Sequence, residues 1–338
     1  MFLQVAWFVI IVALASGYAV LAGFDLGVGI LYPFLGRGAE SRSALRRIVG
    51  PYWDGNEVWL IVLAGALFAA FPPVYGAVLS GFYGLVVLTL LAVVLRAASL
   101  GLSQGGGRWE WVWDAGLFLG SLAVPFLLGA IAGGLVSGVR LLGPAEALPG
   151  GPPLSAYSAL TGALAASAFA FQGASWAALK AREGGLAESA GRARTWATAV
   201  FAGLAVFSAA ATLQAAPERA RAVFSRPLGW LAVAALVLSL VGARAAAMSG
   251  RDRAAFAGSS LAVASLVATV AVSLFPALVP SATGAPLTAY NASSSQLSLA
   301  VMLAIAAIGM PVVIGYTAMM YRLFRGRVGA AGPRGYSQ

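Results

Sequence analysis

Nine long apolar runs, separated by short polar stretches, set the pattern of this chain. They cover residues 5–31, 51–71, 74–98, 111–134, 154–179, 195–216, 227–248, 254–275 and 297–321. Each is close to the roughly 20 residues that an α-helix needs to cross a bilayer. None alternates with the period of two that a membrane β-barrel requires. The pattern predicts an all-α polytopic membrane protein with about nine transmembrane helices.

The connections between the runs suggest how these helices are grouped. The longest outer connections are residues 135–153 and 276–296. We expect two four-helix bundles side by side and one extra helix. The predicted units are a first bundle at 1–134, an outer loop at 135–153, a second bundle at 154–275, an outer loop with the ninth helix at 276–321, and a basic tail at 322–338.

The distribution of charge predicts how the helices are oriented in the membrane. The chain is 60% hydrophobic, only 9% charged and carries a net charge of +10. Seventeen of its 21 lysines and arginines fall in the loops of one side. The positive-inside rule then places the N-terminus outside and the C-terminus in the cytoplasm. Topology therefore explains the positive charge, and no nucleic-acid partner is needed.

One outer loop departs from that rule, because it carries Arg219, Arg221 and Arg226. These arginines could interact with acidic lipid or with a partner subunit, and the sequence leaves both interpretations open.

Two residue types are missing from the whole chain. There is no cysteine and no histidine. A disulfide and a thiolate metal site are excluded, and the commonest haem ligand and general base are absent. Met302 and Met310 lie in the ninth predicted helix.

Two acids stand at the head of the second predicted helix. Asp54 and Glu57 are three residues apart, so they share one helix face. The helix dipole alone favours Asp54 in the first turn, whereas Glu57 lies one turn deeper, where that effect fades. Trp59 is deeper than an interfacial tryptophan needs to be, so it should pack in the protein or against a partner.

Asp25 lies inside the first predicted helix, between Gly23 and Gly27. It is about 18 Å along the helix from Arg37 in the cytoplasmic loop, at 1.5 Å per residue. A carboxylate at this depth needs a partner, and Arg96 at the end of the third predicted helix is the expected one. The pair could be structural, or it could be part of a proton relay or polar channel. Gly23 and Gly27 should let a neighbouring helix approach closely.

The polar groups concentrate in the first bundle. Asp114 opens the fourth predicted helix within an interfacial tryptophan belt, and with the groups above it falls in the cytoplasmic half of the bundle. In the second bundle, Gln172 is a lone polar group. Function is therefore expected in the first bundle.

Several motifs resemble one family. The chain is similar to subunit II of cytochrome bd-type quinol oxidases at residues 23–29, 53–60, 65–72, 80–83, 113–116, 291–295 and 311–322. The runs 23–29 (Gly-Phe-Asp-Leu-Gly-Val-Gly) and 53–60 (Trp-Asp-Gly-Asn-Glu-Val-Trp-Leu) are the most specific.

The resemblance implies a haem-free subunit of a terminal oxidase that oxidises quinol and reduces dioxygen to water in the bacterial cytoplasmic membrane. It implies subunit I as the partner, holding two b haems and one d haem, within membrane lipid, and it allows for small accessory subunits. It further implies that Asp25 and Asp54 carry or organise protons, that Glu57 and Arg96 complete the polar cluster, and that Trp59 lies near the subunit interface where oxygen enters.

The chain departs from the family at one position. Many members carry Thr-Asp-Gly-Phe-Asp before the glycines of the first helix, and here Ala22 replaces the first acid. Either Asp25 and Asp54 suffice for a proton route, or the route runs through subunit I.

A secondary transporter or ion channel using Asp25, Asp54 and Glu57 is the alternative. A transporter should show an inverted repeat with broken helices in both halves. No such repeat is visible, and polarity gathers in one half.

Overall fold

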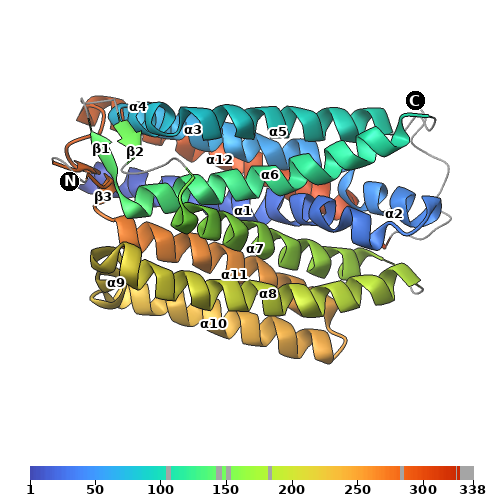
Figure 1. Ribbon diagram of the computed structural model, residues 1–338. Helices are drawn as coiled ribbons and strands as arrows, with labels where there is room; N and C mark the ends of the chain where they lie inside the picture. Colours follow the sequence, from blue (N-terminus) through green and yellow to red (C-terminus); the bar gives the residue numbers. More distant parts are fainter. Residues whose placement is uncertain are drawn as a thin grey trace.

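The computed structural model describes residues 1–103, 108–141, 147–149, 154–181, 185–281, 285–324 and 326–327. Within them lie twelve helices and two small antiparallel hairpins (Figure 1). The helices are α1 (Phe2–Leu35), α2 (Ala39–Val49), α3 (Trp53–Ala70), α4 (Pro72–Gly81), α5 (Tyr83–Leu102), α6 (Glu110–Ser137), α7 (Ala156–Lys180), α8 (Gly185–Ala215), α9 (Pro217–Phe224), α10 (Pro227–Met248), α11 (Asp252–Leu274) and α12 (Gln296–Leu323). The hairpins are β1 (Val139–Leu141) with β2 (Ala147–Pro149), and β3 (Ala277–Val279) with β4 (Leu287–Thr288).

The predicted all-α membrane class is confirmed, but the predicted number of nine spans is not. Seven of the described helices are long and apolar enough to cross a membrane, or eight if the bent pair α3–α4 counts as one span. Helix α7, rich in alanine, glycine and serine, is not among them. Most of its residues are buried against other helices, and a helix surrounded by protein does not need an apolar surface for lipid.

The prediction of one helix over 74–98 is wrong. The chain forms α4 and α5 there, and α4 is bent by 120° from α3. Pro72 begins α4, where its missing N–H costs nothing. Phe82 then leaves helical geometry at φ −120° and ψ 28°. Its ring is buried and lies against Gly134 of α6, so burial of this aromatic side chain accompanies the break in the helix.

Elements that the hydropathy pattern did not predict lie in the loops. Helices α2 and α9 are short and amphipathic, and both hairpins fall within the two outer connections. Residues 142–146 and 150–153 of the first predicted outer loop, and 325 and 328–338 of the predicted tail, lie outside the described residues.

Helix α1 is the centre of the molecule, in contact with α3, α6, α7 and α11 (Figure 1). Its close packing with α7 depends on the predicted pair of small residues. A Cβ at Gly27 would collide with the backbone carbonyl of Phe169, and one at Gly23 would meet Gln172. The small pair therefore allows the predicted close approach, and the neighbour is α7.

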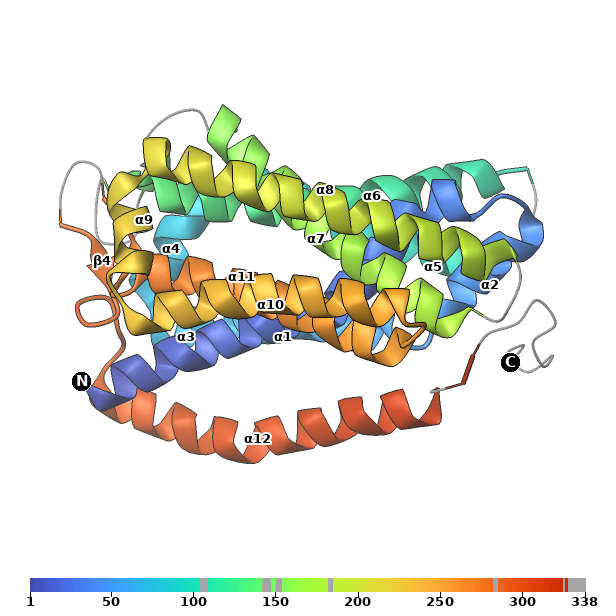
Figure 2. The same ribbon diagram turned by 90° about the horizontal axis from the view of Figure 1, so that it is seen from below.

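Helix α12 runs along one side of the molecule (Figure 2) and is held mainly at its ends. Near its start, the indole Nε1 of Trp7 donates to the carbonyl of Leu299 at 3.0 Å. Past its end, Lys180 Nζ donates to the carbonyl of Phe324 at 2.6 Å and to Tyr52 OH at 3.0 Å. Between these anchors many of its apolar side chains are exposed.

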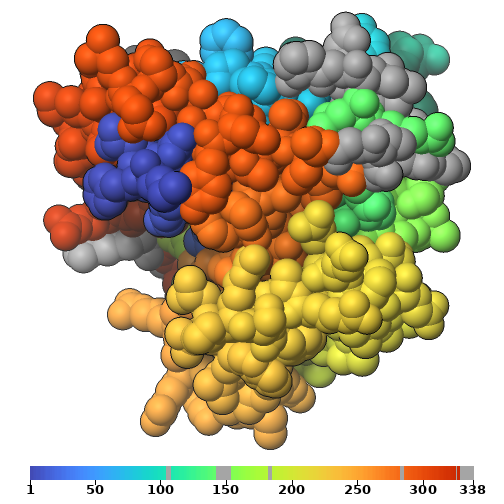
Figure 3. Space-filling view, turned by 90° about the vertical axis from the view of Figure 1, so that its left-hand side faces the viewer, coloured from blue at the N-terminus to red at the C-terminus, as the bar shows by residue number. Residues whose placement is uncertain are grey.

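The N-terminal end of α1 is enclosed by the segment that precedes α12, as Figure 3 shows. Gln4 Nε2 donates to the carbonyl of Tyr290 at 3.1 Å and to Ser293 Oγ at 3.0 Å. The start of α1 and the end of α12 lie at opposite ends of the molecule (Figure 2).

Candidate functional site

Asp25 is buried in the middle of the helix packing, with 1% of its surface exposed. It lies on α1 midway between Gly23 and Gly27, the two glycines that pack against α7. Asn56 of α3 donates from Nδ2 to Asp25 Oδ2 at 2.9 Å and to the carbonyl of Leu21 at 2.8 Å. This amide fixes the carboxylate relative to the backbone of α1.

Arg96 of α5 joins the two carboxylates of the cluster. Its guanidinium is fully buried, and Nη2 lies 3.1 Å from Asp25 Oδ1 while Nη1 donates to Glu57. The ion pair expected between Asp25 and Arg96 is therefore present. Gly120 of α6 lies directly over Arg96, where a Cβ would meet the arginine's own Cβ and backbone. A glycine at this point allows α6 to pack closely against α5 where Arg96 leaves the helix backbone.

The buried cluster has more acidic than basic groups. Asp25 and Glu57 together oppose one guanidinium. Burying charges is costly, and attraction between them offsets that cost only where geometry and hydrogen bonds are good. Asp25 is fully enclosed, but the side chain of Glu57 is 15% exposed. The cluster thus reaches from the protein interior to the surface of α3.

Asp54 and Trp59 lie outside these direct contacts. Asp54 is exposed one turn before Glu57 and has no ion pair or hydrogen bond within the described residues. Trp59 is half-buried, with its ring against Gly17 of α1. Its buried Nε1 has no hydrogen-bond partner in the described part of the chain. The structure thus brings together Asp25, Glu57 and Arg96 of the five predicted site residues.

Two members of the site were not singled out from the sequence. Asn56 is 2% exposed and touches Asp25, and Tyr321 of α12 donates to Asn56 Oδ1 at 3.3 Å. An amide in an apolar helix between two acids was the available signal for Asn56. Tyr321 gave no signal, because its role follows from where α12 returns to α3.

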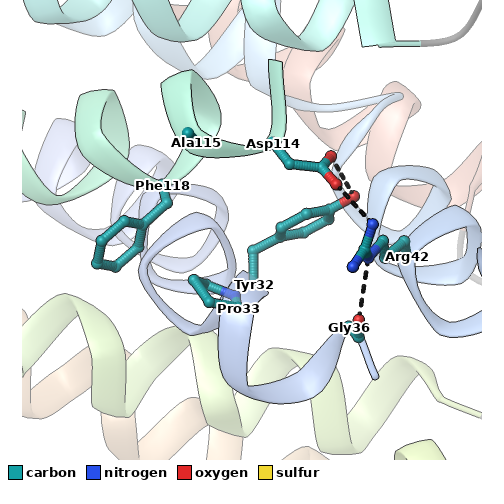
Figure 4. A pocket seen from close by; sticks show the side chains of 7 residues that line it. All are labelled: Tyr32, Pro33, Gly36, Arg42, Asp114, Ala115 and Phe118. Carbon is teal, nitrogen blue, oxygen red and sulfur yellow. Dashed lines mark hydrogen bonds and ion pairs between the residues drawn. The ribbon is translucent and has the colours of Figure 1, made fainter. Parts of the chain in front are cut away.

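Asp114 belongs to a second polar group at one end of the helices. Tyr32 OH donates to its Oδ1 at 2.8 Å and Arg42 Nη1 donates to its Oδ2 at 3.1 Å (Figure 4). Arg46 binds Asp114 as well. Burial opposes the charge of Arg46, but the hydrogen bond with Asp114 and the weaker interactions with Tyr32 and Glu110 together outweigh it and leave the pKa of Arg46 above its ordinary value. Asp114 therefore does more than complement a helix dipole, since it ties α6 to α1 and α2.

The described residues contain no group of three or more histidine, cysteine, aspartate or glutamate side chains placed to hold a metal ion. The chemistry available at the site is that of carboxylates, a guanidinium and an amide. These groups can bind ions and exchange protons.

Comparisons with known proteins identify the family. The family model described as cytochrome bd terminal oxidase subunit II matches residues 3–324. Cytochrome bd-I ubiquinol oxidase subunit 2 of Escherichia coli K12 is 32% identical over 366 aligned positions, covering 96% of this chain and 95% of the relative. Cytochrome bd ubiquinol oxidase subunit 2 of Bacillus subtilis is 33% identical, covering 98% of each.

A solved structure has the same fold. A chain of the bd oxidase from Geobacillus thermodenitrificans superposes with a TM-score of 0.77 at 20% identity, covering 96% of this chain and 99% of that one. Together with the match over nearly the whole sequence, this shows that the chain belongs to the cytochrome bd terminal oxidase subunit II family.

Proposed function

We propose that this chain is the haem-free subunit II of an enzyme that oxidises quinol and reduces dioxygen to water, and that its buried cluster contributes a proton path from the cytoplasm. Membership of a terminal oxidase is given by the family. The observation that carries the finer proposal is the contact of Asp25, Arg96 and Glu57. Quinol as the electron donor is inferred from the relatives, which are named ubiquinol oxidase subunits.

The side chains of this chain do not fit a haem. The sequence has no histidine or cysteine, and the four methionines of the ninth predicted helix, Met302, Met310, Met319 and Met320, all lie on the single helix α12. Histidine and cysteine are prominent among the axial ligands of haem iron in proteins, and this chain offers neither. We therefore assign the two b haems and the d haem of the complex to subunit I.

The cluster offers a means of moving protons. Two carboxylates facing one guanidinium can hold one proton and become neutral as a group. Asp54 is exposed, Glu57 is partly exposed and Asp25 is enclosed, so the three acids form a sequence from surface to interior. Ala22 stands where many relatives have a further acid, and this chain would have to conduct with Asp25 and Asp54 or leave conduction to subunit I.

The orientation follows from loop charge. We place the N-terminus outside and the C-terminus in the cytoplasm, with the first four predicted helices, up to residue 134, carrying the polar cluster. An odd number of crossings agrees with α1 starting and α12 ending at opposite ends of the molecule (Figure 2).

The test is turnover per haem in the assembled oxidase carrying Asp25→Asn, Asp54→Asn or Glu57→Gln. If these acids conduct protons, each variant should keep its haem content and reduce oxygen more slowly. If they only hold the helices together, the amount of complex should fall while turnover per haem stays normal. Unchanged turnover per haem in all three variants would refute the proton path.

A further inference from the structure

A cavity of about 380 Å³ lies between the end of α1, the start of α6 and α2 (Figure 4). It is separate from the buried cluster, because none of Asp25, Glu57 and Arg96 lines it. Its volume falls within the range of sites that hold small molecules or large parts of them. What it could hold follows from how its polar and apolar walls are arranged.

The walls divide into an apolar and a polar side. Figure 4 shows Phe118 and Pro33 on one side, with Arg42 and Asp114 on the other. On α6, Phe118 lies one turn further into the helix than Asp114, so the apolar wall is deeper in the span. A ligand that fills the cavity therefore needs a charged end toward the helix termini and a hydrocarbon end toward the membrane interior.

Arg42 is the polar group with donors to spare. Its Nε donates to the carbonyl of Gly36 at 3.1 Å and its Nη1 to Asp114 at 3.1 Å. A guanidinium carries five N–H groups, and the others have no partner in the described residues. The side chain is 42% exposed, so these donors are accessible.

The charge beside the cavity favours an anion. Both oxygens of Asp114 are taken, by Tyr32 and Arg46 on one and Arg42 on the other. One carboxylate thus serves two guanidinium groups. Arg46 has a second carboxylate partner, Glu110, at 3.3 Å, and Glu110 does not line the cavity. Arg42 has only its share of Asp114, so its positive charge is less neutralised than that of Arg46.

The surroundings are those of a membrane boundary. The cavity lies where α1 ends and α6 begins, and both helices are candidate spans. Three apolar side chains close in sequence to the lining residues are exposed, with Phe34 and Leu119 each 54% exposed and Trp111 67% exposed. Exposed tryptophan at a span end is typical of the headgroup level.

We propose that this cavity binds one membrane glycerophospholipid, with its phosphodiester on Arg42 and an acyl chain along Pro33, Ala115 and Phe118. The phosphate oxygens accept from the free guanidinium N–H groups in the manner of other arginine–phosphate contacts. The inference does not depend on the proton path, and it holds whichever side of the membrane this end faces.

The experiment uses the whole oxidase complex, stripped of loosely bound lipid in detergent and titrated with short-chain phosphatidylglycerol while native mass spectrometry follows binding. Arg42→Gln removes the phosphate contact, and Ala115→Phe fills the cavity without changing charge. The matched control is Arg47→Gln on the same helix, since Arg47 donates to Ser43 at 2.7 Å and does not line the cavity. Arg42→Gln should weaken the binding of phosphatidylglycerol to the complex about fivefold, as expected for one arginine at a lipid surface.

Ala115→Phe should lower retention by at least as much, and Arg47→Gln should leave it unchanged. If Ala115→Phe does not assemble, the difference between the two arginine variants decides. Equal losses in both arginine variants would indicate only general surface attraction and overturn the site. Binding of inorganic phosphate that excludes the lipid, or recovery of a quinone in its place, would overturn it too.

Discussion

At the scale of single residues, the site depends on one guanidinium. Arg96→Gln would leave Asp25 and Glu57 facing each other without a cation, and removal of one partner from a buried ion pair typically costs about 3–5 kcal/mol. We expect a large fall in assembled complex, measured as haem per membrane protein. Asp54→Gln is the matched control, because Asp54 is exposed and unpaired in the described residues and should leave assembly intact. Normal assembly of Arg96→Gln would contradict this account.

Asn56 provides a more graded prediction. Asn56→Ala removes the two hydrogen bonds from its Nδ2, at 2.8 and 2.9 Å, and the acceptor of Tyr321. A buried group left without a partner costs about 1–3 kcal/mol, so thermal unfolding of the complex should begin at lower temperature. Tyr321→Phe loses only the 3.3 Å contact and should shift the midpoint less. A larger shift for Tyr321→Phe than for Asn56→Ala would show that the hydrogen bonds of Asn56 are not what matters.

Most of the charged residues of the buried cluster could be predicted from the sequence, for a physical reason. Ionised groups are rare inside apolar helices because they are costly there, so Asp25, Glu57 and Arg96 were visible as exceptions. The hydrogen-bond partners of these residues could be predicted only in part. Asn56 meets Asp25 within one pair of neighbouring helices, but Tyr321 meets Asn56 only because α12 folds back against α3. Contacts of that kind depend on the tertiary arrangement and leave no local pattern.

At the scale of helices, the crossing of α1 and α7 is the tightest constraint. Gly27 and Gly173 face each other so closely that a Cβ on either would collide with the backbone of the other helix. Gly27→Val should therefore separate the helices and prevent accumulation of the folded chain, since backbone atoms cannot yield as a flexible side chain can. Gly203→Val on α8 is the control, because nothing lies within 4 Å of a Cβ built there. Immunodetection of both variants in membranes, with equal transcript levels, gives the comparison.

Hydropathy located the long helices but not where the chain turns between them. The run from 74 to 98 is apolar throughout, so it predicted one span, although α4 lies across the end of the bundle and only α5 is a candidate span. Phe82 contributes the same hydropathy whether its ring faces lipid or, as here, is buried against α6. Helix α2 was missed for the opposite reason, because its four arginine and glutamate side chains lower its hydropathy while Leu45 and Ile48 pack inward.

At the scale of the whole molecule, the chain alone should bind no haem. Expressed without subunit I and purified in mild detergent, it should show no Soret band, because it has no histidine or cysteine to hold the iron. Co-expression with subunit I should give the full haem spectrum of the oxidase. A stoichiometric haem band from the isolated chain would contradict the assignment of all haems to the partner.

The position of subunit I can be tested with the same absence of cysteine, since any introduced thiol is unique in this chain. The motifs shared with the family gather in the first four predicted helices and the ninth, which are α1 to α6 and α12. Apolar side chains stand exposed on α5 and α12, such as Leu91 at 59% and Ile308 at 75%. Weak packing of α12 between its two anchored ends leaves that surface for a partner. We therefore expect subunit I to cover Leu91 and Ile308, while lipid covers Leu238 of α10, which is 69% exposed.

Leu91→Cys, Ile308→Cys and Leu238→Cys should then react differently with a membrane-permeant maleimide in the assembled oxidase. The first two thiols should be protected in the complex and become reactive when subunit I is omitted. The third should react at the same rate in both preparations, because lipid does not block a reagent that partitions into it. Protection of Leu238→Cys with free reaction of the other two would place subunit I against α10, on the opposite side of the molecule. Since the buried cluster reaches the surface through Glu57 on α3, that result would also separate it from subunit I, to which we assign the haems, and remove the physical basis for a proton path between them.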